Sequence, residues 1–409
     1  SDSQLLFLLH LLAHALVCRY QVYQPVPDPA WREIGELVRF AEAENLPAVR
    51  DSEFPYANGE LHTLTGYTQL ALLRLADPYR LPSGSIWEAY GYIARNATHL
   101  ALLLQYEGSA TTGVYGLPLD HEPHHSLPAP SSGLERNTWR WLDARELLRT
   151  AQLDLDRLVS VTSPPQRLGF SNRLSGADAV QLLGRMLGQW TRSPQRKAAR
   201  FNSNQKIEVA PGLDAAYYFL NHCTAFDPVS YTPAEDENNI DFSRPHRRTA
   251  SDAQRSFRLV ACPARNRSNG GVSLHLDPVN DLALRVGQLV LLAPAEGPGA
   301  ARDWLVGVVR WMVNKSAGIE LGVQYIARNP APVAVRAVSG PSHNACPGLK
   351  SELSLADGQR LSTLITPRSV FKPKAILELH YAGQIRQLRC SQLIECSQGF
   401  ERFSYDLLA

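Results

Sequence analysis

The spacing of apolar side chains changes near residue 190. Before it they recur every three or four positions, and after residue 195 they alternate with polar side chains. The first spacing is typical of amphipathic helices and the second of half-buried strands. We therefore expect an α-helical domain over residues 1–190, arranged as antiparallel helical hairpins. Its six predicted helices cover residues 5–20, 31–46, 61–81, 85–106, 143–160 and 176–192.

Local signals support two of these helices. Pro29 and Trp31 stand at the entry of the second predicted helix, where proline is favoured because its fixed φ suits a first turn. Ser85 is placed to cap the amino end of the fourth helix with its hydroxyl. The segment 107–135 interrupts the helical pattern with Gly, Pro, Ser and His.

The alternating region predicts an antiparallel barrel or sandwich of six strands, because its short runs of Val, Leu and Ile are bounded by turn residues. A helix is expected over residues 213–221, after the first strand, and the acidic stretch TPAEDENNIDFSRP predicts a mobile loop. The six runs are 205–212, 256–264, 270–277, 284–294, 303–313 and 319–327.

The end of the chain predicts a second, smaller β unit. SGPSHNACPGLK, residues 339–350, has the composition of a linker. Four further strand-like runs follow it, over 360–367, 374–382, 384–396 and 400–408. The predicted fold is therefore α+β and multidomain. The domains are an α-helical domain at 1–190, a barrel at 191–338 with an inserted loop at 223–255, and a β unit at 351–409.

Composition and charge exclude several partners. Lys plus Arg is 41 and Asp plus Glu is 39, a net charge of +2, so we expect no nucleic-acid polymer and no membrane surface as partner. The opening apolar run is too short for a membrane span, and no basic segment precedes it as in a secretory signal. The six cysteines contain no Cys-x-x-Cys pair, which favours free thiols in a reducing cytoplasm.

The segment NRSNGG, residues 266–271, stands between two predicted strands. A tight turn needs only one or two residues that tolerate positive φ. This turn also lines up an amide, a hydroxyl and two glycines. Gly270 and Gly271 are expected to take positive φ and to let other groups approach the backbone closely. Asn266 and Ser268 offer short donors and acceptors, so the turn is predicted to be one wall of a ligand site.

A second element, RKAAR, precedes the first predicted strand and has the pattern Arg-x-x-x-Arg. Together with Asn266-x-Ser268-x-x-Gly271 it resembles the two-part signature of the PilZ domain family. LVGVVRW and ELGVQYIA are similar to the last strands of such domains. The resemblance covers residues 192–338 and implies a six-stranded β-barrel that binds cyclic di-GMP.

The resemblance also implies roles for individual residues. Arg196 and Arg200 would contact guanine and phosphate, and Asn266 and Ser268 the opposite guanine. A guanidinium can donate two hydrogen bonds to guanine O6 and N7, grip a phosphate, or stack on a purine. Arg192 is a further candidate that would favour an intercalated nucleotide dimer over one nucleotide.

A narrower resemblance concerns the whole chain. PilZ proteins with a long helical amino-terminal region, here containing YQPVPDPAW, and a carboxy-terminal β region, here ending in FERFSYDL, are similar in arrangement. It implies a cytoplasmic, non-enzymatic effector linked to pili, motility and surface attachment. A protein partner would bind through the helical domain, and no cofactor or metal is expected.

The two halves of the signature lie unusually far apart. The loop 223–255 separates them and has its own arginines, among them Arg247, Arg248 and Arg255. We consider these three as an alternative first half, but their spacing is not Arg-x-x-x-Arg. Only one predicted strand lies between Arg255 and Asn266, whereas the barrel needs two. Arg196 and Arg200 are preferred, and phosphate contacts from Arg247 and Arg248 stay open.

Two rival functions remain. HEPHH, residues 121–125, formally matches the zincin motif His-Glu-x-x-His, which needs a helix to place both histidines on one face. Pro123 lies within it, so a surface loop is expected. The other rival is a protein-interaction adaptor whose barrel no longer binds nucleotide.

Overall fold

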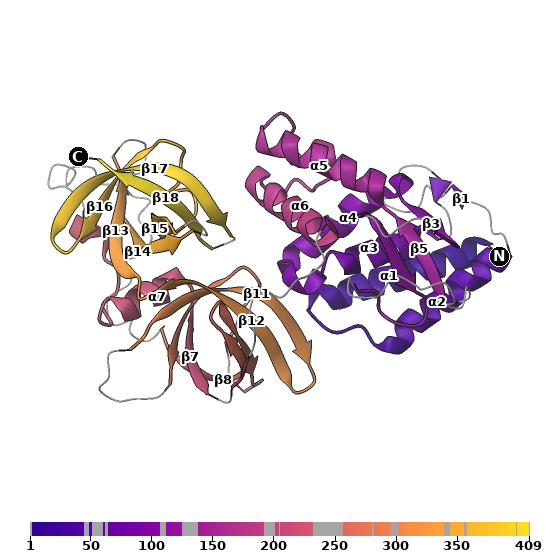
Figure 1. Cartoon of the computed structure of the whole chain (residues 1–409), viewed down its shortest axis with the longest axis horizontal. Coiled ribbons are helices and arrows are strands. Elements are labelled where there is room, and N and C mark those ends of the chain that lie inside the picture. The colour runs from indigo at the N-terminus through magenta and orange to yellow at the C-terminus, as the bar shows by residue number, and fades with distance from the viewer. Residues whose placement is uncertain are drawn as a thin grey trace. The chain divides into compact units, whose positions relative to one another are not determined.

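The computed structural model describes residues 2–44, 49–50, 60–61, 64–106, 112–124, 138–191, 201–203, 205–231, 257–279, 282–295, 302–338, 344–355, 358–397 and 399–408. The chain forms two compact units. One comprises Ser1–Lys197 with Val313–Lys315, and the other comprises Ala198–Met312 with Ser316–Ala409. Figure 1 shows the first as mainly helical and the second as two β-barrels.

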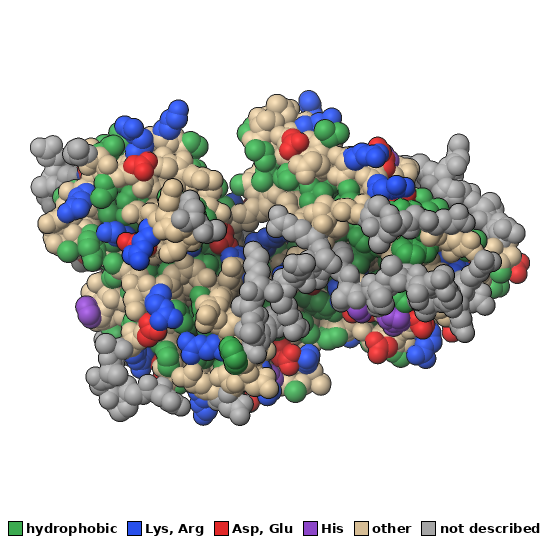
Figure 2. Space-filling model, in the orientation of Figure 1, with side chains coloured by type: hydrophobic (Ala, Val, Ile, Leu, Met, Phe, Trp, Pro, Cys, Tyr) green, Lys and Arg blue, Asp and Glu red, His purple; other side chains and the backbone are tan. Residues whose placement is uncertain are grey.

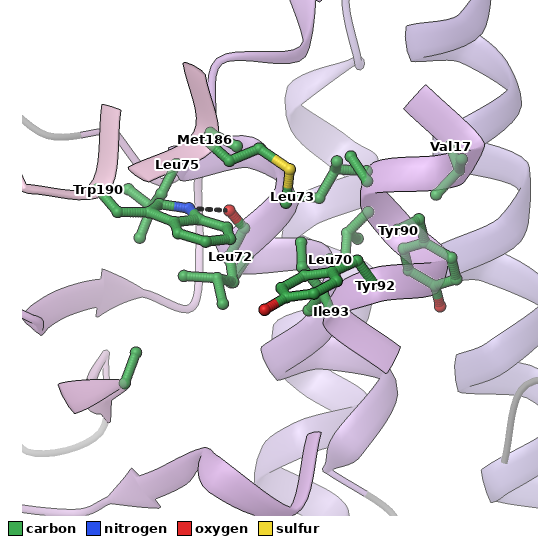
Figure 3. Close-up of a cluster of buried hydrophobic side chains, with 14 of the residues drawn as sticks. Val17, Leu70, Leu72, Leu73, Leu75, Tyr90, Tyr92, Ile93, Met186 and Trp190 are labelled. Atoms are coloured by element: carbon green, nitrogen blue, oxygen red, sulfur yellow. Dashed lines mark hydrogen bonds between the residues drawn. The ribbon is translucent and has the colours of Figure 1, made fainter. Parts of the chain in front are cut away.

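The first unit confirms the six predicted helices. They bury one continuous apolar core, to which Trp31, Tyr67 and Trp190 contribute the largest side chains. Figure 3 shows the part of this core where the Trp190 indole N–H donates to the Leu72 carbonyl oxygen at 3.0 Å. The helices are α1 (Asp2–Gln21), α2 (Asp28–Ala43), α3 (Thr65–Leu75), α4 (Ile86–Arg95), α5 (Arg145–Val159) and α6 (Gly176–Thr191).

The amino-terminal unit also contains strands that the sequence pattern did not predict. β3 (Ala101–Leu103), β5 (Trp139–Asp143) and β4 (Val114–Pro118) form a three-stranded antiparallel sheet in that order. These runs of three to five residues are too short to show alternation against helical surroundings. A two-stranded ribbon, β1 (Val49–Arg50) and β2 (Glu60–Leu61), is also present. The predicted Ser85 cap was wrong, since its side chain makes no capping hydrogen bond.

Short 3-10 helices connect the elements of the chain. Among the residues that the structure describes, four lie in the amino-terminal unit and one follows α7 in the second unit. They are η1 (Pro78–Arg80), η2 (Ser83–Ser85), η3 (Ala97–His99), η4 (Pro165–Leu168) and η5 (Pro228–Tyr231).

The middle barrel has the six strands that the alternating pattern predicted. Its hydrogen-bonded order is β8-β7-β10-β11-β12-β9, and pairing between β8 and β9 closes it. A short strand, β6 (Phe201–Asn202), adds to β8 outside this ring. The expected helix is α7 (Leu213–Leu220). The strands are β7 (Lys206–Pro211), β8 (Val260–Ser268), β9 (Gly271–Leu276), β10 (Leu289–Pro294), β11 (Leu305–Lys315) and β12 (Gly318–Arg328).

The carboxy-terminal β unit is a second closed barrel, with order β13-β14-β15-β18-β17-β16. Four strands were predicted there and six are present. The sequence-based division left β13 (Ala331–Ala337) in the middle domain and most of β14 (Cys346–Ser354) in the linker, but both pair within this barrel. Closure needs them, because without β13 and β14 the edges of β15 and β16 would be unpaired. The other strands are β15 (Arg360–Thr366), β16 (Ile376–Tyr381), β17 (Gln384–Cys396) and β18 (Glu401–Leu407).

The two barrels share apolar packing. α7 contacts β7 and β10 of the middle barrel and β13 and β14 of the second, and Figure 1 shows it between them. One buried cluster joins Leu291, Val306 and Val308 to Ile365 and Phe400. Only Asn329 and Pro330 separate β12 from β13. The barrels therefore form one packed body rather than two domains on a flexible tether.

Candidate functional site

The predicted ligand turn is a tight hairpin between β8 and β9. Asn266 lies opposite Ser273, and Ser268 lies opposite Gly271, so only Asn269 and Gly270 make the turn. A register shift between Ala264 and Asn266 places a bulge just before the motif, where a strand can redirect its side chains. The Ser268 hydroxyl donates to the Gly271 carbonyl oxygen at 3.3 Å. The hairpin thus presents Asn266 and Ser268, both half-buried, at one end of the barrel.

The two glycines of the turn differ in what they do. A Cβ on Gly271 would lie 2.3 Å from the Val323 carbonyl oxygen, so only glycine lets β9 approach β12 this closely. A Cβ on Gly270 would meet nothing within 4 Å. Neither residue has a positive φ, so that part of the expectation was wrong. The turn is closed instead by the Tyr325 amide, which donates to the Gly270 carbonyl oxygen at 2.9 Å.

Arg192, Arg196 and Arg200 lie outside the described residues, as do Arg247 and Arg248. The residues next to Arg200 in the sequence are described. Phe201 lies opposite Arg267, and Asn202 lies opposite Asn266. β6 therefore pairs with the Asn-Arg-Ser segment itself. The first two residues after Arg200 therefore pair with the strand that carries the predicted ligand motif.

Polar and aromatic side chains continue across the strands from Asn266. Asn266 pairs with Ser273 on β9, and Ser273 pairs with Gly322 on β12. A Cβ on Gly322 would lie 1.9 Å from Nε1 of Trp311, so glycine makes room for this half-buried indole. Trp311 is a site candidate that sequence reasoning missed. The signal was present in LVGVVRW, which was interpreted only as a strand pattern.

Arg267 is held by two partners. Its guanidinium donates to Gln205 Oε1 at 3.3 Å and also hydrogen-bonds the Tyr325 hydroxyl. Burial raises the pKa of Tyr325, while the neighbouring Arg267 opposes this shift. Because successive side chains of a strand point to opposite faces, Arg267 projects to the other face of β8 from Asn266 and Ser268.

The described part of HEPHH lacks the helix that the zincin motif needs. Residues 121–124 are not helical, and His125 lies outside the described residues. Glu122 instead accepts a hydrogen bond from the Tyr20 hydroxyl at 3.0 Å and forms an ion pair with Arg74, whose Nε lies 2.8 Å from Glu122 Oε1. Within the described ranges, no three His, Cys, Asp or Glu side chains gather as a metal site would require. Residues 121–124 form a loop, as predicted, and Glu122 connects this loop to α1 and α3.

On the face drawn in Figure 2, the described Lys and Arg side chains are interspersed with those of Asp and Glu. Among the described residues, no helix is long and apolar enough to cross a membrane.

Three family models match the chain in order along the sequence. They are described as the amino-terminal domain of the cyclic-di-GMP receptor FimW (residues 4–107), its middle PilZ domain (224–332) and the FimW carboxy-terminal β-barrel domain (353–408). The chain belongs to the PilZ domain family, in the group with a helical amino-terminal domain and a second, carboxy-terminal barrel. Along its length it is similar to the cyclic-di-GMP receptor FimW of Pseudomonas aeruginosa, with 25% identity over 446 residues that cover 96% of this chain and 70% of that protein.

The residue range matched by the middle PilZ domain model includes one of the two arginine-rich segments and leaves out the other. It begins at residue 224, so it leaves out RKAAR and includes RPHRR at Arg244–Arg248. Arg244 and Arg248 have the spacing Arg-x-x-x-Arg. The alternative first half considered from the sequence comprised Arg247, Arg248 and Arg255, which lack this spacing, and it left out Arg244. The chain contains two candidate first halves, and both arginine pairs lie outside the described residues.

Proposed function

We propose that this protein is a non-enzymatic receptor for cyclic di-GMP that binds the nucleotide over the β8–β9 turn. The observation that carries the proposal is the pairing of β6 with β8. Phe201, the residue that follows RKAAR in the sequence, lies opposite Arg267 in the hairpin that holds Asn266 and Ser268. The two motifs are 66 positions apart in sequence, and the strand that follows the first one pairs with the second. The similarity to a protein named as a cyclic-di-GMP receptor supports the same ligand.

The chemistry of the neighbouring side chains fits a guanine dinucleotide. Arg196 and Arg200 supply guanidinium groups for a guanine edge or a phosphate, with Arg192 as a further candidate. Asn266 and Ser268 supply the amide and hydroxyl for the opposite guanine. The indole of Trp311, on the same cross-strand row, offers a face on which a purine can stack.

The same geometry favours RKAAR over RPHRR as the first half. β8 runs from Val260 to Ser268, nine residues or about 30 Å of extended chain at about 3.3 Å per residue. The loop that contains Arg244 and Arg248 enters β8 at its Val260 end, whereas the motif lies at the Ser268 end. RKAAR instead joins β6, which is already paired with the motif.

Binding would act on the rest of the protein through the segment that contains these arginines, because it connects the two compact units. Contacts made only in the bound state shift the equilibrium between arrangements of the units. We propose that the helical unit then binds a protein partner, and that the output is control of pili, motility or surface attachment in the cytoplasm of a bacterium.

Calorimetric titration of cyclic di-GMP tests the proposal. Wild type should bind, and Arg200→Ala should lose about 1–3 kcal/mol, or roughly ten- to a hundredfold in affinity, as expected for one bidentate guanine contact. Arg248→Ala is the matched control and should bind as wild type does. The reverse pattern would move the first half to RPHRR. No binding by wild type would favour an adaptor whose barrel binds no nucleotide.

A further inference from the structure

One ion pair connects the nucleotide turn to the other barrel. Arg310 on β11 donates from its two terminal nitrogens to Glu395 on β17, at 2.5 and 3.0 Å. The same guanidinium donates from Nε to Gln324 Oε1 at 2.7 Å. Gln324 lies directly opposite Gly271 of the turn. Glu395 of the carboxy-terminal barrel is thus connected, through Arg310 and Gln324, to β12, the strand against which Gly271 packs.

Glu395 lies between two arginines, Arg310 of the middle barrel and Arg402 of its own barrel. Its Cα partner across the strands is Arg402 on β18, which is 3% exposed. Burial lowers the pKa of Arg402, and the Glu395 carboxylate opposes that shift. The Arg402 guanidinium hydrogen-bonds Thr363 Oγ1 at 3.2 and 3.3 Å. One carboxylate therefore faces a guanidinium from each barrel.

The surrounding contacts make this connection stiff. The Ser397 hydroxyl donates to the Gly287 carbonyl oxygen at 2.5 Å, also between the barrels. Asn329, at the two-residue junction, has φ +44° and accepts from the Trp304 amide at 2.7 Å. With the shared apolar cluster, these contacts leave the second barrel little freedom to move without moving β11 and β12.

We propose that Glu395 is a positioning residue for the nucleotide turn, acting through Arg310 and Gln324. The turn's role as a nucleotide site rests on the proposed function. With Glu395 in place, Arg310 is fixed and holds Gln324, and β12 stays seated against Gly271. The turn and the second barrel then respond to each other, as thermodynamic linkage requires.

Amide hydrogen exchange of the ligand-free full chain tests this. The reporter is the Tyr325 amide, which closes the turn by donating to Gly270. Glu395→Gln should speed its exchange roughly tenfold through easier local opening. Arg310→Lys should do the same, because one ammonium cannot hold both Glu395 and Gln324 in the fork geometry. The matched control is Glu378→Gln, which breaks the Arg336–Glu378 pair within the second barrel and should leave Tyr325 unchanged.

A second arm adds cyclic di-GMP. In wild type the nucleotide should slow exchange along β17 as well as at Tyr325, and in Glu395→Gln the slowing on β17 should be lost. Equal effects of Glu395→Gln and Glu378→Gln on Tyr325, or no effect of either, would overturn the inference. Failure of wild type to bind would overturn the proposed function instead, and the ligand-free arm would still decide whether Glu395 positions the turn.

Discussion

At the scale of single residues, the close contacts of the turn depend on glycines, which have no Cβ atom. Gly271 is required because β12 occupies the space of its Cβ, whereas Gly270 borders open space. Gly322 is required for the same reason, because the indole of Trp311 occupies the space of its Cβ. The site is therefore defined by close backbone approach as much as by its polar side chains.

Gly271→Ala should destabilise the second unit by about 1–3 kcal/mol, the usual range for overpacking. The added methyl would lie 2.3 Å from the Val323 carbonyl oxygen, so β9 and β12 must separate. Gly270→Ala, one position earlier, should change stability by less than about 0.5 kcal/mol. Urea unfolding compares the two, and equal losses would contradict the assigned difference.

Glu401 gives a prediction on pH. It is 5% exposed and accepts hydrogen bonds from the Ser369 and Phe371 amides, but burial still raises its pKa above the ordinary value of 4.5. A raised pKa means that the folded state binds this proton more tightly than the unfolded state. Glu401 therefore destabilises the fold increasingly as pH rises from 4.5 through its folded pKa.

The measurement is the free energy of unfolding against pH for wild type and Glu401→Gln. The difference between the two should change across that window and become flat above it. A difference that is constant from pH 4.5 to neutrality would show that Glu401 titrates normally.

At the scale of elements, the side chain of Glu122 holds the loop that contains HEPHH against two helices. Glu122 joins the loop to Tyr20 on α1 and Arg74 on α3, and Arg74 also lies over the Tyr79 ring at 5.7 Å. The burial of Tyr20 and the neighbouring carboxylate raise the pKa of its hydroxyl, which therefore stays a donor. Glu122 is a structural residue in this arrangement.

Glu122→Ala should cost about 2 kcal/mol, because it leaves a buried hydroxyl and a guanidinium without their acceptor. His121→Ala is the control from the same motif. Its half-exposed imidazole pairs with Asp120, and its loss should cost less than about 0.5 kcal/mol. Thermal unfolding measures both. Stoichiometric zinc in the purified protein, lost in His121→Ala, would restore the metal interpretation.

At the scale of the whole molecule, the second unit folds as two barrels around a shared core. A fragment of residues 198–409 should therefore unfold in one calorimetric transition. A fragment that ends at residue 330 should expose Leu291, Val306 and Val308, bind a hydrophobic dye and aggregate. Two separate transitions in the longer fragment would show that the barrels are independent.

Much of this architecture follows from the sequence alone. The change of hydrophobic period near residue 190 placed the boundary between the mainly helical unit and the barrels, because side-chain direction repeats every 3.6 residues in a helix and every 2 in a strand. All six strands of the middle barrel were found this way, as was α7. Asn266, Ser268 and Gly271 were identified as one turn because their sequence neighbours are strands.

Only the tertiary structure decided the rest. Strand pairing joins β6 to β8 and places Phe201 opposite Arg267, a contact that no local pattern encodes. The same is true of β13 and β14, which the sequence pattern assigned to the middle domain and mostly to the linker, but which pair within the second barrel. The Arg310–Glu395 pair spans 85 positions of sequence. The sequence determines which faces are apolar, but which faces meet depends on long-range packing, which residue periodicity does not contain.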